Sequence, residues 1–172
     1  MDNNDILIRL RYALDIKNKD MVEIFKLGGI ELTKEEVLLV LTKSKDDYED
    51  DADDFDYEDE NEENIKCDNA MLESFLNGFI TFKRGKQELK PGQPERPALT
   101  NERVNNLVLK KLKIALSLTS EDMHEILKTA NFKVTKGELS AILRKEGHKN
   151  YKECGDQFAR NFLKGLAIKY RA

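Results

Sequence analysis

The sequence has few of the features that mark membrane, secreted or metal-bound proteins. Its 172 residues include no tryptophan, three prolines and two cysteines. The longest uninterrupted apolar run, residues 37–41, has five residues, whereas a membrane-spanning helix needs about 20. The first residues also lack the basic and apolar regions of a signal peptide. We therefore expect a cytoplasmic protein that does not interact with a membrane.

The two cysteines do not form a closely spaced pair of the kind found in zinc sites. Cys67 and Cys154 are 87 positions apart, and in a reducing compartment such residues are thiols rather than a disulfide. His148 lies six residues from Cys154, but no histidine takes the equivalent place near Cys67. We predict two buried structural thiols, no metal site and no cofactor.

Charge is distributed unevenly along the chain, whose net charge is −4. Residues 46–63 contain 13 acidic and no basic residues, which leaves the remainder at +9. Such a block repels itself and cannot bury enough apolar surface to offset the entropy of ordering, so we expect a disordered acidic loop. An alternative is that this loop lies on the chain's own basic surface and competes with an anionic ligand.

An internal repeat organises the rest of the sequence. Residues 4–41 align without gaps with residues 106–143, and 13 of the 38 positions are identical, where ordinary residue usage gives about two. After the acidic block the match resumes at a shorter shift, pairing Cys67 with Cys154. The change of shift makes the acidic block largely an insertion into the first copy.

The repeat predicts a two-part organisation. We place the first copy at residues 1–84, with the acidic insertion at 46–63, and the second copy at residues 104–172. Residues 85–103 hold all three prolines and show no apolar periodicity, so they are predicted to form a linker.

Apolar residues recur at helical spacing, which predicts an all-α fold of two tandem, packed copies with roughly four helices each. The short second helix is expected to begin at an N-cap, Asn18 in the first copy and Ser120 in the second. The fourth helix is expected to follow Asp68 in the first copy and Asp156 in the second.

The third helix of each copy opens with the sequence of a capping box. Thr33 precedes Glu36 by three residues, and Thr135 precedes Glu138 by three. In this motif the hydroxyl and the carboxylate each accept a hydrogen bond from an otherwise unpaired backbone amide. We therefore assign structural roles to Thr33 and Thr135.

A glycine occupies the same place in the fourth helix of both copies. Gly78 and Gly165 each cost roughly 1 kcal/mol relative to alanine in a helix, which implies a packing reason for them. A missing side chain allows another helix to approach closely. We predict that helices cross near the two glycines, either within one copy or across a pseudo-twofold axis between the copies.

Several stretches resemble the bacterial YehS-like family. They are residues 105–112, residues 148–158, Phe75-Leu76-Asn77-Gly78 and Lys83-Arg84-Gly85. The resemblance covers nearly the whole chain except the acidic block, and the Tyr-x-x-Cys-Gly-Asp-Gln-Phe run that begins at Tyr151 is long enough to be specific. It implies two copies of one helical domain. Because the family has no assigned function, it supplies no catalytic or binding residue.

The second copy is strongly basic, which raises the hypothesis of nucleic-acid binding. Residues 106–172 contain 14 basic and seven acidic residues. Under this hypothesis, the second and third helices of this copy are expected to form a helix-turn-helix. The candidates to face phosphate or bases are Lys136, Arg144, Lys145, Lys149 and Tyr151. The joining segment, Thr129 to Val134, is longer than the motif's turn of three or four residues, and scattered lysines are also typical of a solvated helical surface.

The sequence contains no Gly-rich phosphate loop, zinc ligand set or nucleophile elbow. We therefore predict that the protein is not an enzyme. The first hypothesis is a protein-interaction or regulatory module that binds an unidentified protein partner or self-associates. The alternative is a nucleic-acid-binding protein that uses the basic second copy.

Overall fold

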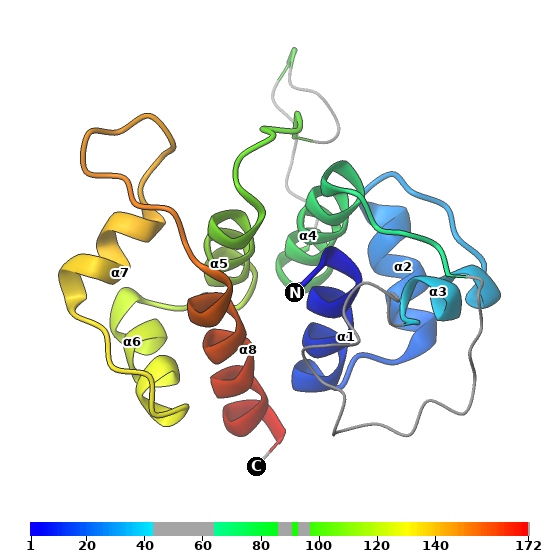
Figure 1. Ribbon diagram of the computed structural model, residues 1–172. Coiled ribbons are helices and arrows are strands. Elements are labelled where there is room, and N and C mark those ends of the chain that lie inside the picture. Colours follow the sequence, from blue (N-terminus) through cyan, green and yellow to red (C-terminus); the bar gives the residue numbers. More distant parts are fainter. Residues whose placement is uncertain (43–63, 86–90, 93–96, 172) are drawn as a thin grey trace.

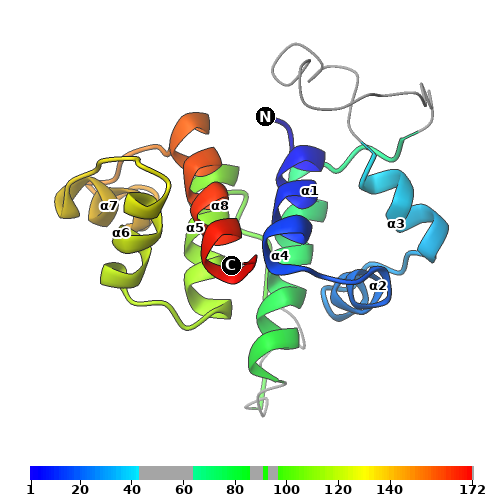
Figure 2. The same ribbon diagram turned by 90° about the horizontal axis from the view of Figure 1, so that it is seen from below.

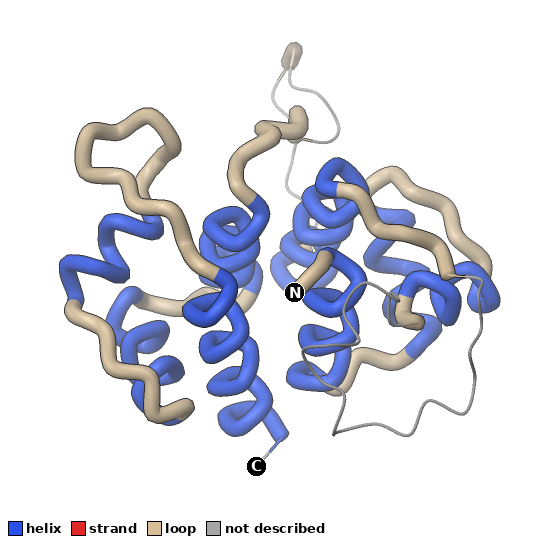
Figure 3. The backbone as a smooth tube through the Cα atoms, viewed as in Figure 1, coloured by secondary structure: helices blue, strands red, loops and turns tan. Residues whose placement is uncertain are grey.

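The computed structural model describes residues 1–42, 64–85, 91–92 and 97–171. These residues form eight α-helices (Figure 1 and Figure 3), namely α1 Asn3–Leu14, α2 Asn18–Leu27, α3 Lys34–Val40, α4 Asn69–Arg84, α5 Val104–Ala115, α6 Ser120–Thr129, α7 Lys136–Leu143 and α8 Asp156–Arg171. Four helices fall in each copy, which confirms the predicted all-α fold of two tandem four-helix units. Within the described ranges, no helix is long and apolar enough to cross a lipid bilayer.

Two predicted segments lie wholly or partly outside the described residues. The predicted acidic loop at residues 46–63 belongs to the undescribed range 43–63. The predicted linker at residues 85–103 includes 86–90 and 93–96, which are also outside it.

The two copies pack through a central layer made of α1, α4, α5 and α8. Within this layer α1 packs against α8 and α4 packs against α5, so both contacts join one copy to the other. Because α5 repeats α1 and α8 repeats α4, a pseudo-twofold axis relates the two contacts. The helices α2 and α3 flank the layer on one side, and α6 and α7 flank it on the other (Figure 1 and Figure 2).

A pair of arginines repeats this symmetry at the helix ends. The guanidinium Nη1 of Arg84, at the end of α4, donates a 3.3 Å hydrogen bond to the carbonyl of Ile114 at the end of α5. The equivalent Arg171, at the end of α8, donates a 2.9 Å hydrogen bond to the carbonyl of Tyr12 near the end of α1. The last carbonyls of a helix lack partners within the helix and favour a positive charge. Each copy therefore caps a helix of the other copy.

A buried asparagine at the start of α1 joins three backbone segments of the first copy. Asn4 is 0% exposed. Its Nδ2 donates to the carbonyls of Val40 at 2.7 Å and Ile65 at 2.8 Å, and its Oδ1 accepts the amide of Cys67 at 2.9 Å. The side chain thus connects the end of α3 to the segment that leads into α4.

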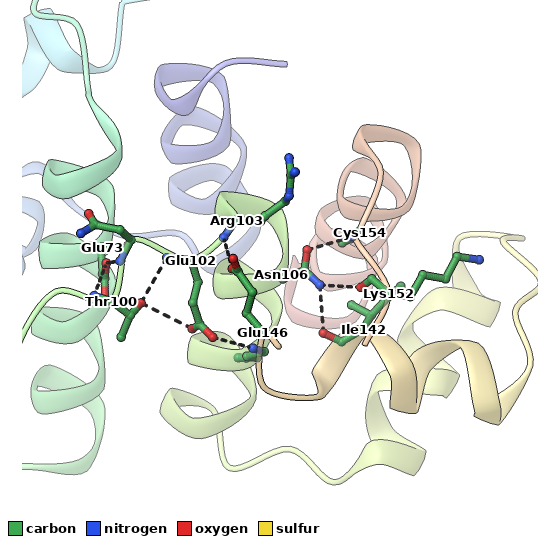
Figure 4. Close-up of polar contacts among 11 residues, drawn as sticks. Glu73, Thr100, Glu102, Arg103, Asn106, Ile142, Glu146, Lys152 and Cys154 are labelled. Atoms are coloured by element: carbon green, nitrogen blue, oxygen red, sulfur yellow. Dashed lines mark hydrogen bonds and ion pairs between the residues drawn. The ribbon is translucent and has the colours of Figure 1, made fainter. Parts of the chain in front are cut away.

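The second copy repeats this arrangement with Asn106 on α5. Its Nδ2 donates to the carbonyls of Ile142 at 3.0 Å and Lys152 at 2.9 Å. Its Oδ1 accepts the amide of Cys154 at 2.8 Å (Figure 4). Leaving a buried backbone group unpaired costs about 1–3 kcal/mol. The equivalent asparagines, Asn4 and Asn106, therefore hold the corresponding backbone segments of the two copies in the same arrangement.

The paired glycines mark helix crossings inside each copy. A Cβ added to Gly78 on α4 would overlap the carbonyl oxygen of Ile24 on α2. A Cβ added to Gly165 on α8 would likewise overlap the carbonyl oxygen of Ile126 on α6. Of the two alternatives raised by the sequence, the structure shows the crossing within a copy.

Helix α3 begins as the sequence indicated. The Thr33 hydroxyl accepts a 3.1 Å hydrogen bond from the amide of Glu36, whose carboxylate accepts the Thr33 amide at 3.0 Å. In the second copy the Thr135 hydroxyl accepts the amide of Glu138 at 3.0 Å. The reciprocal hydrogen bond from the Thr135 amide to the Glu138 carboxylate is not formed between these two described residues, so the predicted capping box is wrong in that half.

The predicted N-caps of the second helices are wrong by one residue. Asn18 is the first helical residue of α2, whose N-cap is Lys17, and the Asn18 Oδ1 accepts a 2.8 Å hydrogen bond from Arg11 instead. Ser120 is the first helical residue of α6, whose N-cap is Thr119. Asn18 and Ser120 already have helical backbone, whereas an N-cap residue needs an extended one.

The expected start of α4 is confirmed and that of α8 is shifted. Asp68 is the N-cap of α4, and its Oδ1 accepts the amide of Met71 at 2.8 Å. Asp156 is itself the first residue of α8. Its carboxylate accepts a 2.8 Å hydrogen bond from Asn105 Nδ2, so this side chain links α8 to α5.

Candidate nucleic-acid interface

An open groove of about 430 Å³ lies in the second copy, where α5, the start of α6 and the end of α7 meet. It is lined by Lys110, Lys113, Ile114, Ser120, Ser140, Leu143 and Arg144. Three of these seven side chains are cationic, two carry hydroxyl groups and two are apolar. The groove therefore presents hydrogen-bond donors and positive charge, the chemistry that recognises phosphate.

Helix α5 places two of the lysines on one face. Lys110 and Lys113 are three residues apart, a spacing that makes side chains neighbours on a helix surface. The preceding residues Leu109 and Leu112 are both 0% exposed and anchor the neighbouring face of α5 in the core. The lysines are consequently held at the groove by a helix that packs firmly into the core.

The start of α6 supplies a hydroxyl to the groove. Ser120 follows the capping box in which the Thr119 hydroxyl accepts the Asp122 amide at 3.0 Å and the Asp122 carboxylate accepts the Thr119 amide at 2.9 Å. These hydrogen bonds to Thr119 lower the pKa of Asp122 below its ordinary value. The first turn of α6 is therefore fixed, with Ser120 exposed on it.

The end of α7 supplies the remaining lining residues of the groove. Leu139 and Ile142 are each 2% exposed and turn one face of α7 to the core, which leaves Ser140 exposed. Arg144 is the C-cap of α7, and its Nε is buried with no hydrogen-bond partner among the described residues. Arg144 lines the groove together with the two lysines of α5.

Lys110 also contacts two residues that do not line the groove, Glu102 and Tyr151. Its Nζ lies 3.1 Å from Glu102 Oε1, with both side chains less than a fifth exposed, and 5.8 Å from the centre of the Tyr151 ring. Partial burial favours the neutral form of Glu102, but the hydrogen bond and charge of Lys110, with smaller contributions from Glu146 and Thr100, together outweigh it and lower the pKa of Glu102. Burial and nearby carboxylates raise the pKa of Tyr151, so this phenol is neutral.

The segment that carries Glu102 is anchored to the first copy by a buried carboxylate. Glu73 on α4 is 2% exposed. It accepts hydrogen bonds from the Thr100 amide at 2.8 Å, the Thr100 hydroxyl at 3.0 Å and the Asn101 amide at 3.3 Å (Figure 4). On the other side, the amide of Arg103 donates a 3.3 Å hydrogen bond to Glu146. Residues 100–103 thus contact both copies.

The five candidates proposed from the sequence are only partly brought together. Arg144 lines the groove, and Tyr151 lies behind it against Lys110. Lys136 is at the opposite end of α7, while Lys145 and Lys149 are exposed on the segment between α7 and α8.

Sequence reasoning did not single out Lys110 or Lys113. For Lys110 the signal is a difference between the copies, whereas Lys113 aligns with the basic Arg11 and has no such signal. In the repeat, Lys110 aligns with Ile8 and Arg144 aligns with Thr42, so charge appears only in the second copy at these places.

Both cysteines lie beside the buried asparagines. Cys67 is 3% exposed and Cys154 is 7% exposed, and both are free thiols. Burial, aided by the charge of Asp68 for Cys67 and of Asp156 for Cys154, raises the pKa of each thiol to about 12. Because the thiolate is the reactive form, neither side chain is equipped to act as a nucleophile.

Comparison with known proteins gives two separate family matches, one in each copy. The family described as "Protein of unknown function (DUF1456)" matches residues 3–85 and again residues 105–172. The chain is 43% identical to the Escherichia coli (strain K12) protein titled "Uncharacterized protein YehS", over an alignment that covers 98% of this chain and 96% of that protein. No solved structure matches it. The chain therefore belongs to this family of unknown function, the YehS-like proteins, as the residues around Tyr151 indicated.

Proposed function

We propose that the chain is a non-enzymatic nucleic-acid-binding protein that holds the phosphate backbone in the groove formed by α5, α6 and α7. The observation that carries this proposal is that Lys110, Lys113 and Arg144 line one groove together with two hydroxyl side chains. Lysine and arginine contacts to phosphate supply most of the affinity of non-specific nucleic-acid binding.

The difference between the copies supports this assignment. The described helical parts of the first copy, residues 3–42 and 64–84, contain nine basic and nine acidic residues, whereas residues 106–172 contain 14 basic and seven acidic residues. Lys113 has the counterpart Arg11, but that guanidinium donates to Asn18 Oδ1. The excess of positive charge and the basic groove therefore belong to the same copy.

The short helix α7 and its long connection to α6 favour contacts with the phosphate backbone of a nucleic acid over contacts with its base edges. Helix α7 has eight residues, and its exposed positions are Lys136, Gly137, Glu138 and Ser140. Six residues separate α6 from α7, more than the turn of a helix-turn-helix. Because α7 offers one cation and one carboxylate, we expect little discrimination between base sequences.

A second candidate function is self-association through the first copy. The positions that correspond to Ile114 and Ser140 of the groove are Tyr12 and Leu38, which are 59% and 51% exposed. Exposed apolar side chains of this kind favour a protein partner. Sedimentation of the intact chain against its Leu38→Asp variant tests this function, since a self-association that uses this surface must weaken in the variant.

Nucleic-acid binding is tested by fluorescence anisotropy of a labelled DNA duplex and a labelled single-stranded RNA. Neutralising three phosphates gives a slope of about −2.7 in log affinity against log salt, or a loss of about 40-fold between 50 and 200 mM salt. The double variant Lys113→Gln/Arg144→Gln should lower the slope to about −0.9. The matched control is Lys26→Gln/Lys128→Gln, which removes the same charge from exposed, equivalent positions of α2 and α6.

The outcomes separate groove binding from general charge attraction. The proposal expects the groove variant to bind weakly and the control to bind nearly as well as the parent. Equal losses in both variants, or no binding by the parent chain, would overturn it. Circular dichroism melts of all variants show whether a loss of binding follows a loss of folding.

A further inference from the structure

The ion pair between Lys110 and Glu102 has a consequence for the groove. Lys110 is one of its three cations, yet its ammonium is already paired with a carboxylate at 3.1 Å. A phosphate that contacts Lys110 must either displace Glu102 or share the ammonium with it. Both routes oppose binding, because the negative charges of phosphate and carboxylate repel.

This inference rests on the function proposed above and names a residue that controls it. We propose that Glu102 is an intramolecular competitor for phosphate in the groove, and that it lowers the affinity of the protein for nucleic acid by occupying Lys110. The residue is a positioning residue, since it acts on the ligand through the lysine.

The contacts of Glu102 show that its carboxylate is held in place. The Thr100 hydroxyl lies 3.4 Å from Glu102 Oε2 and accepts a 3.4 Å hydrogen bond from the Glu102 amide (Figure 4). Thr100 is in turn bound by the buried Glu73 of α4. A carboxylate held by this anchored segment loses less entropy in its pair with Lys110 than a freely rotating side chain, so it competes more effectively.

The low exposure of the pair strengthens the competition. The side chains of Lys110 and Glu102 are 17% and 18% exposed, so water and salt screen their attraction less than at an open surface. By contrast, the pair between Arg103 and Glu153 is 61% and 58% exposed. Glu153 therefore provides a carboxylate of the same charge that should have little effect on the groove.

The test compares Glu102→Gln with Glu153→Gln in the anisotropy assay on labelled single-stranded RNA and DNA duplex. Glutamine keeps the size of the side chain but removes its charge. Removing the competing carboxylate lowers the cost of the contact between Lys110 and phosphate, so Glu102→Gln should tighten binding by about 3- to 10-fold. The three phosphate contacts, and with them the salt slope of about −2.7, should stay as in the parent chain. Glu153→Gln should change the affinity by less than about twofold.

A double variant separates action through Lys110 from a general charge effect. In a Lys110→Ala background, adding Glu102→Gln should no longer tighten binding, because the residue on which Glu102 acts is gone. A gain that persists in this background, or equal gains for both glutamine variants, would overturn the inference. If the parent chain binds and Glu102→Gln binds equally, this inference fails while the proposed function stands. If neither binds, the proposed function fails.

Discussion

Alanine at Gly78 or Gly165 tests the close helix crossing that shapes both copies. A Cβ at position 78 would overlap the Ile24 carbonyl oxygen and lie 2.7 Å from the Gly28 amide nitrogen. Both neighbours are backbone atoms, so they cannot rotate away as a flexible side chain could. The helices α2 and α4 must therefore move apart.

The expected magnitude combines two opposing effects. Forcing a methyl group into a closely packed site costs about 1–3 kcal/mol, and a crossing of two backbones belongs at or above the upper end of that range. Alanine regains about 1 kcal/mol through its higher helix propensity. We expect Gly78→Ala to lower the free energy of unfolding by about 2 kcal/mol and the melting temperature by about 4–8 °C.

Urea denaturation followed by circular dichroism measures this effect, with Gly137→Ala as the matched control. Gly137 is also helical, but its nearest neighbour for an added Cβ is the Thr135 hydroxyl at 3.9 Å. This control should stabilise the protein by about 0.5–1 kcal/mol. Stabilisation by Gly78→Ala as well would refute the crossing, and Gly165→Ala should repeat the loss in the second copy.

Three further predictions concern the buried polar groups. Asn106→Ala, and likewise Asn4→Ala, should lower the free energy of unfolding by about 3 kcal/mol, because each change leaves three backbone groups unpaired; a loss below about 1 kcal/mol in urea denaturation would contradict this. Cys67 and Cys154, with their raised pKa of about 12, should react with iodoacetamide far more slowly in the native protein than in guanidinium, as followed by mass spectrometry. Because folding lowers the pKa of Glu102 from its ordinary value of 4.5, its stabilisation is complete above that pH and is lost as the pH falls through the folded value. Glu102→Gln should flatten the dependence of unfolding free energy on pH in that range, and an unchanged profile would contradict the ion pair.

The fold could be predicted from the sequence because the patterns that specify its helices are local and occur in both copies. Helical spacing of apolar residues gave the helices, and the paired Gly78 and Gly165 indicated a close crossing. The N-caps were less accessible, since Thr119 and Ser120 are adjacent hydroxyl residues and either one satisfies the local pattern. The structure gives Thr119 the extended backbone and makes it the N-cap, a difference of one residue that local patterns do not resolve.

The groove was less accessible because it is assembled from distant residues. Lys113 and Arg144 are 31 positions apart in the sequence, and only the packing of α7 against α5 brings them to the same groove. The sequence-based choice followed a helix-turn-helix pattern and so favoured Lys136, which lies at the far end of α7. The anchoring of Thr100 by Glu73 depends in the same way on the contact between the copies.

The most direct test of the central claim is to locate bound nucleic acid on the protein. Amide chemical shifts of the isotopically labelled chain are followed by nuclear magnetic resonance during titration with a short single-stranded RNA and a short DNA duplex. We predict that the largest changes fall at residues 110–120 and 140–144, which surround the groove, with small changes at residues 8–18 and 38–42 of the first copy. Changes centred on the first copy, or no changes with either nucleic acid, would contradict the proposal.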